Sequence, residues 1–168
     1  MPGRMGLTTK ERKAVLRNQA SNLLWYGKIK VTEGHVQSLR PYVEKIITLA
    51  VNTYTDTVET TVVTKDAKGK EVTKKVIKDG PKKLAARRKI MSLTYDLQFV
   101  KENGESKADF KARVKGINHP LIEKIFNEIA PKYAERAKEL GQGGGYTRRY
   151  LLGERRGDAA EVAVVELV

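Results

Sequence analysis

The fold is decided by the closing stretch of the chain, which reads Tyr146-Thr147-Arg148-Arg149-Tyr150-Leu151-Leu152, then Gly153-Glu154-Arg155-Arg156-Gly157-Asp158, and finally Val162-Ala163-Val164-Val165-Glu166-Leu167-Val168. Its first and last parts are rich in β-branched, aromatic and other apolar residues, which favour strands. The middle part holds two glycines and an aspartate, which favour a turn. We therefore predict a hairpin of two strands, at about residues 145–152 and 160–168.

Four arginines of this hairpin are candidates for binding an anion: Arg148, Arg149, Arg155 and Arg156. A guanidinium group is planar, offers paired donors to phosphate oxygens and can stack on bases. Strand alternation puts Arg148 and Arg149 on opposite faces, so only one of them is expected to meet a given surface. Tyr146 and Tyr150 share a face, where their rings can either stack on bases or pack in the core.

The N-terminal half predicts a helix, a short strand and a second helix. Thr8-Thr9-Lys10-Glu11 fits a capping box, and the helix that follows should end near Tyr26 because Gly27 supplies a stop. Residues 28–32 alternate like a strand. Thr32 can then cap a helix that reaches about Ala50, in which Pro41 should cause a bend or a late start.

The second half predicts two more helices ahead of the closing strands. The third runs from Pro81 to about Leu93, and its candidate core residues are Leu84, Ala85, Ile90 and Met91. The fourth begins at Pro120, should kink or divide at Pro131, and ends at Gly141. The expected fold class is α/β, of the α+β kind. It is a two-layer arrangement of helix, strand, three helices and two strands around a small sheet, in one domain over residues 1–168.

Two segments read as insertions into this order. Residues 52–80 contain two threonine- and valine-rich runs separated by a polar loop, which predicts an inserted β-hairpin that projects from the body. Residues 96–118 predict a polar surface segment with some helix around Phe110. Lysines of both segments could reach nucleic acid or a neighbouring protein, and the sequence leaves both possibilities open.

The charge of the chain points to a polyanionic partner. Its 168 residues include 33 Lys and Arg against 20 Asp and Glu, a formal net charge of +13. An excess of this size on a small protein is typical of proteins that bind nucleic acid. The N-terminus lacks the apolar segment of an export signal, and no apolar run is long enough to span a bilayer, so we expect a cytoplasmic protein.

The sequence argues against an enzyme and against a cofactor or metal. Cysteine is absent, which excludes disulfides and thiolate chemistry. His35 and His119 are the only histidines, and each falls at a predicted helix start, where a capping or surface role is expected. The glycine run at residues 141–145 lacks the Lys-Ser or Lys-Thr and the helix that a phosphate-binding loop requires. We expect no small-molecule substrate.

The candidate RNA-binding residues lie in three groups. They are Arg4, Lys10, Arg12, Lys13 and Arg17 near the N-terminus; Lys82, Lys83, Arg87 and Arg88 on the third helix; and Tyr146, Arg148, Arg149, Arg155 and Arg156 in the closing hairpin. Lysines and arginines on a helix can equally form a solvated face that only keeps the protein soluble. A DNA-binding or anionic-surface-binding module is the alternative function, and an enzyme acting on a phosphorylated metabolite is a more distant one.

Several segments resemble the bacterial large-subunit ribosomal protein L17 family, in the same order along the chain. They are Lys13–Asn18, Leu39–Ala50, Ala86–Arg88, Ile125–Ala134, Gly144–Arg148, Gly153–Ala160 and Val165–Val168. The resemblance implies a structural component of the large ribosomal subunit that supports translation. Its partners would be large-subunit rRNA and neighbouring ribosomal proteins near the polypeptide exit region.

By matching position, the resemblance implies RNA contacts at Arg17, Arg87, Arg88, Tyr146, Arg148, Arg155 and Arg156. The chain departs from the family at its N-terminus, where residues 1–7 offer only Arg4 in place of a longer basic arm. The two insertions also look longer than the connections usual in the family.

Overall fold

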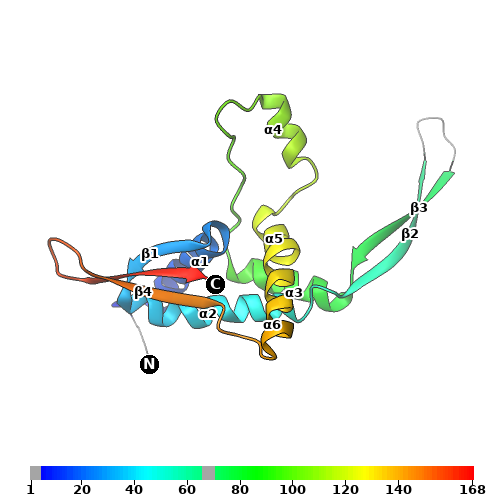
Figure 1. Cartoon of the computed structure of the whole chain (residues 1–168). Coiled ribbons are helices and arrows are strands. Elements are labelled where there is room, and N and C mark those ends of the chain that lie inside the picture. The colour runs from blue at the N-terminus through cyan, green and yellow to red at the C-terminus, as the bar shows by residue number, and fades with distance from the viewer. Residues whose placement is uncertain (1–4, 66–70) are drawn as a thin grey trace.

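Figure 1 shows the arrangement of the chain in a computed structural model, which describes residues 5–65 and 71–168. The body of the molecule consists of α1 (Thr9–Tyr26), β1 (Lys28–Thr32), α2 (Glu33–Val51), α3 (Pro81–Leu93), α5 (Pro120–Lys124), the π-helical turn η1 (Ile125–Ile129), α6 (Ala130–Leu140), β4 (Thr147–Glu154) and β5 (Glu161–Leu167). This order confirms the predicted α+β class and its sequence of helices and strands.

The first helix forms where its capping signals place it. Glu11 Oε2 accepts from the Thr8 backbone N–H at 2.9 Å, and Thr8 Oγ1 accepts from the Glu11 backbone N–H at 3.5 Å, so the capping box is complete. Gly27 ends α1 in the left-handed region, at φ 79°. The buried stripe of the helix includes Leu16, Ala20, Leu23 and Leu24.

The late start that Pro41 was predicted to impose on the second helix is not observed. Helix α2 runs from Glu33 to Val51 with Pro41 inside it. A proline removes one backbone donor from a helix, but Leu39 and Val43 on either side are fully buried. Burial of this apolar face is the stronger effect, so the helix continues past the proline.

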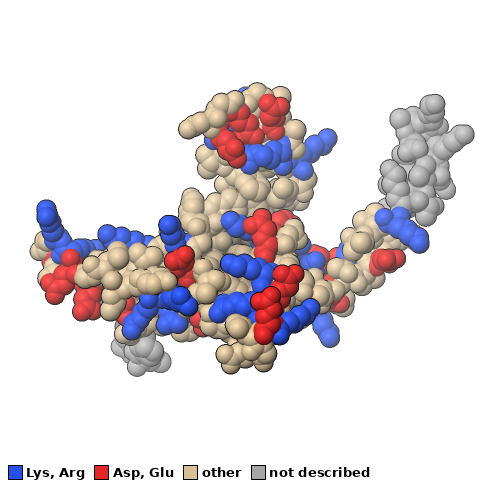
Figure 2. All heavy atoms as spheres, viewed as in Figure 1, with Lys and Arg blue, Asp and Glu red and all other residues tan. Residues whose placement is uncertain are grey.

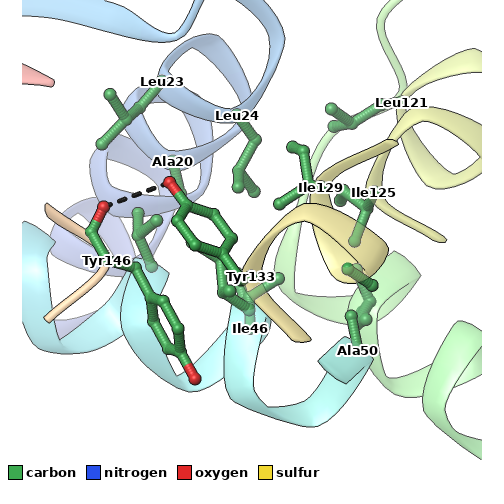
Figure 3. Close-up of a cluster of buried hydrophobic side chains, with 14 of the residues drawn as sticks. Ala20, Leu23, Leu24, Ile46, Ala50, Leu121, Ile125, Ile129, Tyr133 and Tyr146 are labelled. Atoms are coloured by element: carbon green, nitrogen blue, oxygen red, sulfur yellow. Dashed lines mark hydrogen bonds between the residues drawn. The ribbon is translucent and has the colours of Figure 1, made fainter. Parts of the chain in front are cut away.

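The last helical stretch is divided just before Pro131, as predicted. The π-helical turn η1 separates α5 from α6, and Pro131 then falls in the first turn of α6, where its missing N–H costs little. Ile125, Ile129 and Tyr133 point from this stretch into the main core (Figure 3). The Tyr133 hydroxyl donates to the Tyr146 carbonyl at 3.3 Å, which ties α6 to the start of β4.

The closing hairpin joins β1 in a three-stranded antiparallel sheet with the order β1-β5-β4. Helices α1 and α2 pack on one face of this sheet and form the second layer. The register shifts between Leu151 and Gly153, which is a bulge, and Gly153 has φ 89°.

Two excursions leave the body (Figure 1). The first is the β2–β3 ribbon, an antiparallel pair of Thr57–Lys65 and Glu71–Asp79, which confirms the predicted hairpin. The second, called the α4 segment, covers residues 95–118 and contains α4 (Lys107–Val114), which includes Phe110 as predicted.

The prediction for the core face of α3 was wrong in part. Leu84, Ala85 and Met91 are exposed, whereas Ala86 and Ile90 are buried. Rotation of the helix toward its neighbours also buries the stem of Lys83, whose ammonium group reaches a carboxylate at the root of the ribbon.

Candidate nucleic-acid interface

Helix α1 presents basic side chains near its N-terminus. Lys10 and Lys13 are exposed and Arg12 is half-buried. None of these three takes part in an ion pair among the described residues. Arg4 lies outside the described residues. The positive end of the helix dipole lies at the same end of α1, so an external anion would be favoured there.

Arg17 on the same helix is partly occupied by contacts within the molecule. Its Nη2 donates to the Thr94 carbonyl at 3.2 Å, and its guanidinium carbon lies 4.5 Å from the centre of the Tyr95 ring. These contacts join α1 to the end of α3. Arg17 is therefore a less accessible contact for RNA than Lys10 or Lys13.

Some basic side chains of α3 lie inside the molecule and others lie on its surface. Lys83 Nζ lies 3.0 Å from Asp79 Oδ1, and Arg87 lies 2.5 Å from Asp79 Oδ2 and 2.6 Å from Glu123 Oε1. Both basic side chains are less than one-fifth exposed. The predicted RNA contacts Lys83 and Arg87 are thus corrected to anchors inside the molecule, while Lys82 and Arg88 remain exposed.

Tyr146, a predicted RNA contact immediately before β4, lies in the core. Tyr146 is 4% exposed, and its ring centre lies 4.8 Å from that of Tyr133 (Figure 3). A ring in this position cannot stack on a base, so the predicted role of Tyr146 is corrected to packing. The backbone turns between the glycine run and the strand, where Gly145 has φ 62°, and this turn directs the tyrosine inward.

The two adjacent arginines of β4 lie on opposite faces, as strand alternation predicts. Thr147 and Arg149 face α2: the Thr147 hydroxyl donates to Glu44 Oε1 at 2.7 Å, and Arg149 is ion-paired with Glu33. Arg148 points to the other face, together with Tyr150, and both are exposed. Both arginines are exposed, and Arg148 is the member of the pair that has no ion-pair partner among the described residues.

The tip of the β4–β5 hairpin is ordered by a paired hydrogen bond. Arg155 Nε and Nη2 donate to the two carboxylate oxygens of Asp158 at 2.7 and 2.6 Å. The same contact holds the pKa of Asp158 down at about 2 and raises the pKa of Arg155. Because the carboxyl pKa is lowered by folding, this contribution is present above the ordinary Asp pKa and is lost as the pH falls toward 2.

Arg156 stands at the tip without such a partner. It is exposed and has no carboxylate within 4 Å among the described residues. The turn beside it contains Gly157 at φ 103° and Ala159 at φ 51°. The Arg155–Asp158 contact therefore orders the tip, while Arg156 offers its charge to solvent.

Sequence reasoning missed two cations on β1. Lys28 and Lys30 are exposed and alternate with the half-buried Ile29 and Val31. The alternation was visible in the sequence, but the position of β1 beside β5 was not. Figure 2 shows basic side chains over these strands and at the outer end of the hairpin, with acidic side chains between them.

Both histidines make contacts within the molecule. His119 takes the N-cap position of α5 and lies 3.3 Å from Asp96, and His35 lies 2.8 Å from the Gln19 amide. Within residues 5–65 and 71–168, no three histidine or acidic side chains gather into a group that could hold a metal ion. No helix in that part of the chain has both the length and the hydropathy to traverse a bilayer.

The chain is similar to known proteins over nearly its whole length. The sequence pattern of the family described as Ribosomal protein L17 matches residues 15–168. Proteins named large ribosomal subunit protein bL17 are 38% identical in Lachnospira eligens and 33% identical in Acetivibrio thermocellus, and both comparisons cover 98% of this chain and 97% of the relative. A protein of the same name from Clostridium botulinum, strain Loch Maree, is 35% identical over 98% of this chain and 96% of the relative.

Proposed function

The chain belongs to the Ribosomal protein L17 family, and on this premise we propose that it is a structural, non-catalytic constituent of the large ribosomal subunit in the cytoplasm. It binds large-subunit rRNA through basic surfaces of its helices and of its closing hairpin. Its further partners are neighbouring proteins of the same subunit. The relatives that carry the name of a large-subunit protein support this assignment.

One structural observation carries the RNA-binding part of the proposal. Among the described residues, the exposed cations without an ion-pair partner include Lys10 and Lys13 on α1, Lys82 and Arg88 on α3, and Arg148 on β4, with Arg156 at the hairpin tip. Helices and strands hold their stems in fixed directions. A structured polyanion can neutralise all of them with little further ordering of the protein.

The hairpin arginines provide the test. In the variant R148E/R156E, two exposed cations become acidic without breaking a hydrogen bond or ion pair of the described structure. We expect incorporation into large subunits to fail and affinity for large-subunit rRNA to fall by roughly tenfold or more, because two phosphate contacts become repulsive. Circular dichroism and thermal unfolding should be unchanged. Arg149 and Arg155 are left unchanged, because replacing either one would leave its carboxylate partner, Glu33 or Asp158, without an ion pair.

A matched control separates position from charge. The variant K107E/K111E makes the same change in net charge on the exposed face of α4. It should lose much less affinity than R148E/R156E. Normal incorporation of R148E/R156E into large subunits would refute the assigned role of the hairpin. If the unchanged protein bound duplex DNA or anionic vesicles as tightly as rRNA and was absent from large subunits, the alternative function of a DNA-binding or anionic-surface-binding module would be favoured instead.

A further inference from the structure

The three-stranded sheet has one covered face and one open face. Ile29 and Val31 of β1 join the core, Ala163 and Val165 of β5 are fully buried, and Arg149 of β4 is paired with the first residue of α2. In the register these positions lie opposite one another, so they share the face that packs on α1 and α2. The alternate positions must lie on the other face.

The alternate positions form three rows across the strands, and the row nearest the hairpin tip is Thr32, Val162 and Gly153, with Val162 buried. The first row is Lys28, Glu166 and Arg148, and the second row is Lys30, Val164 and Tyr150. Lys28, Lys30, Arg148 and Tyr150 are exposed, with Tyr150 at 46%, and none of the described helices packs on this face. The open face thus presents three cations and one aromatic ring against a single carboxylate.

A hollow extends this face toward the hairpin tip. It is lined by Lys30, Val31, Thr32 and Val162 of the sheet and by Arg155, so it includes one residue, Val31, of the core-facing set. The charge of Arg155 is balanced by Asp158, but its guanidinium still forms a wall of the hollow. The first two rows cross all three strands, and the hollow shares Lys30 with the second row.

This surface fits unpaired RNA better than duplex RNA or a protein. An exposed ring on a sheet stacks on a base that is free of its helix, while flanking cations contact the adjoining phosphates. Bases of a duplex are already stacked and cannot reach the ring. A protein partner would need an apolar centre, whereas the first two rows place three cations and one carboxylate beside Tyr150 and the half-buried Val164.

We propose that the open face of the sheet binds an unpaired segment of RNA, with one base stacked on Tyr150 and phosphates held by Lys28, Lys30 and Arg148. This rests on the proposed function and specifies the kind of RNA that the sheet takes. Glu166 lies between Lys28 and Arg148 in the register and repels phosphates, so its charge weakens binding at this face.

The test compares variants of the full-length chain on one RNA. The probe is a fragment of large-subunit rRNA with unpaired loops, with a fully paired RNA duplex of the same length as reference. Tyr150→Leu removes the aromatic ring and should lower affinity for the looped RNA about tenfold, whereas Tyr150→Phe should keep it. The variant K28A/K30A should also weaken binding, and Glu166→Gln should strengthen it about two- to threefold.

Two controls guard against a loss of folding or of general charge. Leu151 is an exposed residue next to Tyr150, but in the register it lies opposite Ala163 and so belongs to the other face of the sheet. The variant Leu151→Ala should bind the looped RNA as tightly as the unchanged protein does. K107A/K111A removes two lysines from α4 and should have little effect. Thermal unfolding of every variant should match that of the unchanged protein.

Photo-cross-linking identifies what lies on the face. With 4-thiouridine in the loops of the rRNA fragment, we expect a cross-linked peptide that contains Tyr150. Unchanged affinity of Tyr150→Leu, or an equal loss on the duplex, would overturn the proposal. A cross-link in intact subunits from this face to a ribosomal protein would overturn it too. In each of these cases failure of R148E/R156E to enter large subunits would still support the proposed function.

Discussion

At the scale of single residues, the position of the Asp56 carboxylate requires a glycine at residue 80. A Cβ atom at Gly80 would lie 2.4 Å from the carboxyl group of Asp56. That carboxylate accepts from the backbone N–H groups of Lys82 and Lys83 at 2.8 and 3.2 Å. Asp56 therefore caps the first turn of α3, and only glycine leaves room for it.

Gly80→Ala should lower the free energy of unfolding by about 1–2 kcal/mol, the range expected when a helix loses its N-terminal cap. The measurement is urea denaturation followed by circular dichroism. If the cause is the clash with Asp56, the double variant D56A/G80A should be no less stable than D56A alone. Gly34→Ala is the matched control, because a Cβ there meets nothing within 4 Å. Equal stability of G80A and the unchanged protein would contradict the argument.

At the scale of elements, the β2–β3 ribbon is held by its root. A two-stranded ribbon is marginally stable alone in water. Asp79, the last residue of β3, pairs with Lys83 and Arg87 of α3, and Arg87 also pairs with Glu123 of α5. The Arg87 guanidinium lies 5.0 Å from the Phe126 ring as well. These contacts fix the direction of the ribbon relative to the body.

Asp79→Asn should weaken this root and leave the sheet intact. It removes the charge that faces two largely buried cations, which should cost about 1–3 kcal/mol. Hydrogen exchange should become faster in β2 and β3 and at the start of α3, with no change in β1, β4 and β5. Glu59→Gln, on an exposed position of the ribbon, is the control and should not alter exchange. Uniformly faster exchange across the molecule would show that the ribbon has no separate anchor.

The α4 segment is organised differently, around one arginine. Arg113 donates to both carboxylate oxygens of Glu105, at 2.9 and 3.0 Å, and its guanidinium lies 5.6 and 5.5 Å from the rings of Phe99 and Phe110. Phe99 in turn packs on Trp25 of α1, with ring centres 5.4 Å apart. Helix α4 buries no residue of its own, so this cluster replaces a hydrophobic core in the segment.

At the scale of the whole molecule, the exposed cations stand on elements that are far apart in the chain. Helices α1 and α3 and the β4–β5 hairpin each contribute two of the partnerless cations described above. Contacts of this kind act independently when they are more than about 7–10 Å apart and share no partner. We therefore expect RNA binding to be the sum of several separate phosphate contacts.

The salt dependence of binding measures that sum. Replacement of Lys82 and Arg88 by alanine should reduce the slope of log Kobs against log salt concentration by about 1.4–1.8, since each lost contact contributes about 0.7–0.9. The titration uses large-subunit rRNA at several salt concentrations. K107A/K111A is the control and should leave the slope unchanged. An unchanged slope for K82A/R88A would mean that α3 faces away from the RNA.

The sequence by itself determined the elements and their order. Capping signals, glycine stops and the change from helical to strand periodicity act within a few residues, so the ends of α1, the hairpin and the helix around Phe110 could all be predicted. The net charge and the arginine pairs were likewise enough to predict a polyanionic partner.

Only the tertiary structure decided which of these side chains are engaged within the molecule. Lys82 and Lys83 are alike in the sequence, as are Arg148 and Arg149, but in each pair one member meets a carboxylate from another element. Tyr146 and Tyr150 share a strand parity, yet a turn before β4 directs the first into the core. These outcomes depend on the rotation of whole helices and on strand neighbours distant in the chain, because ion pairing and burial are decided by packing rather than by local pattern.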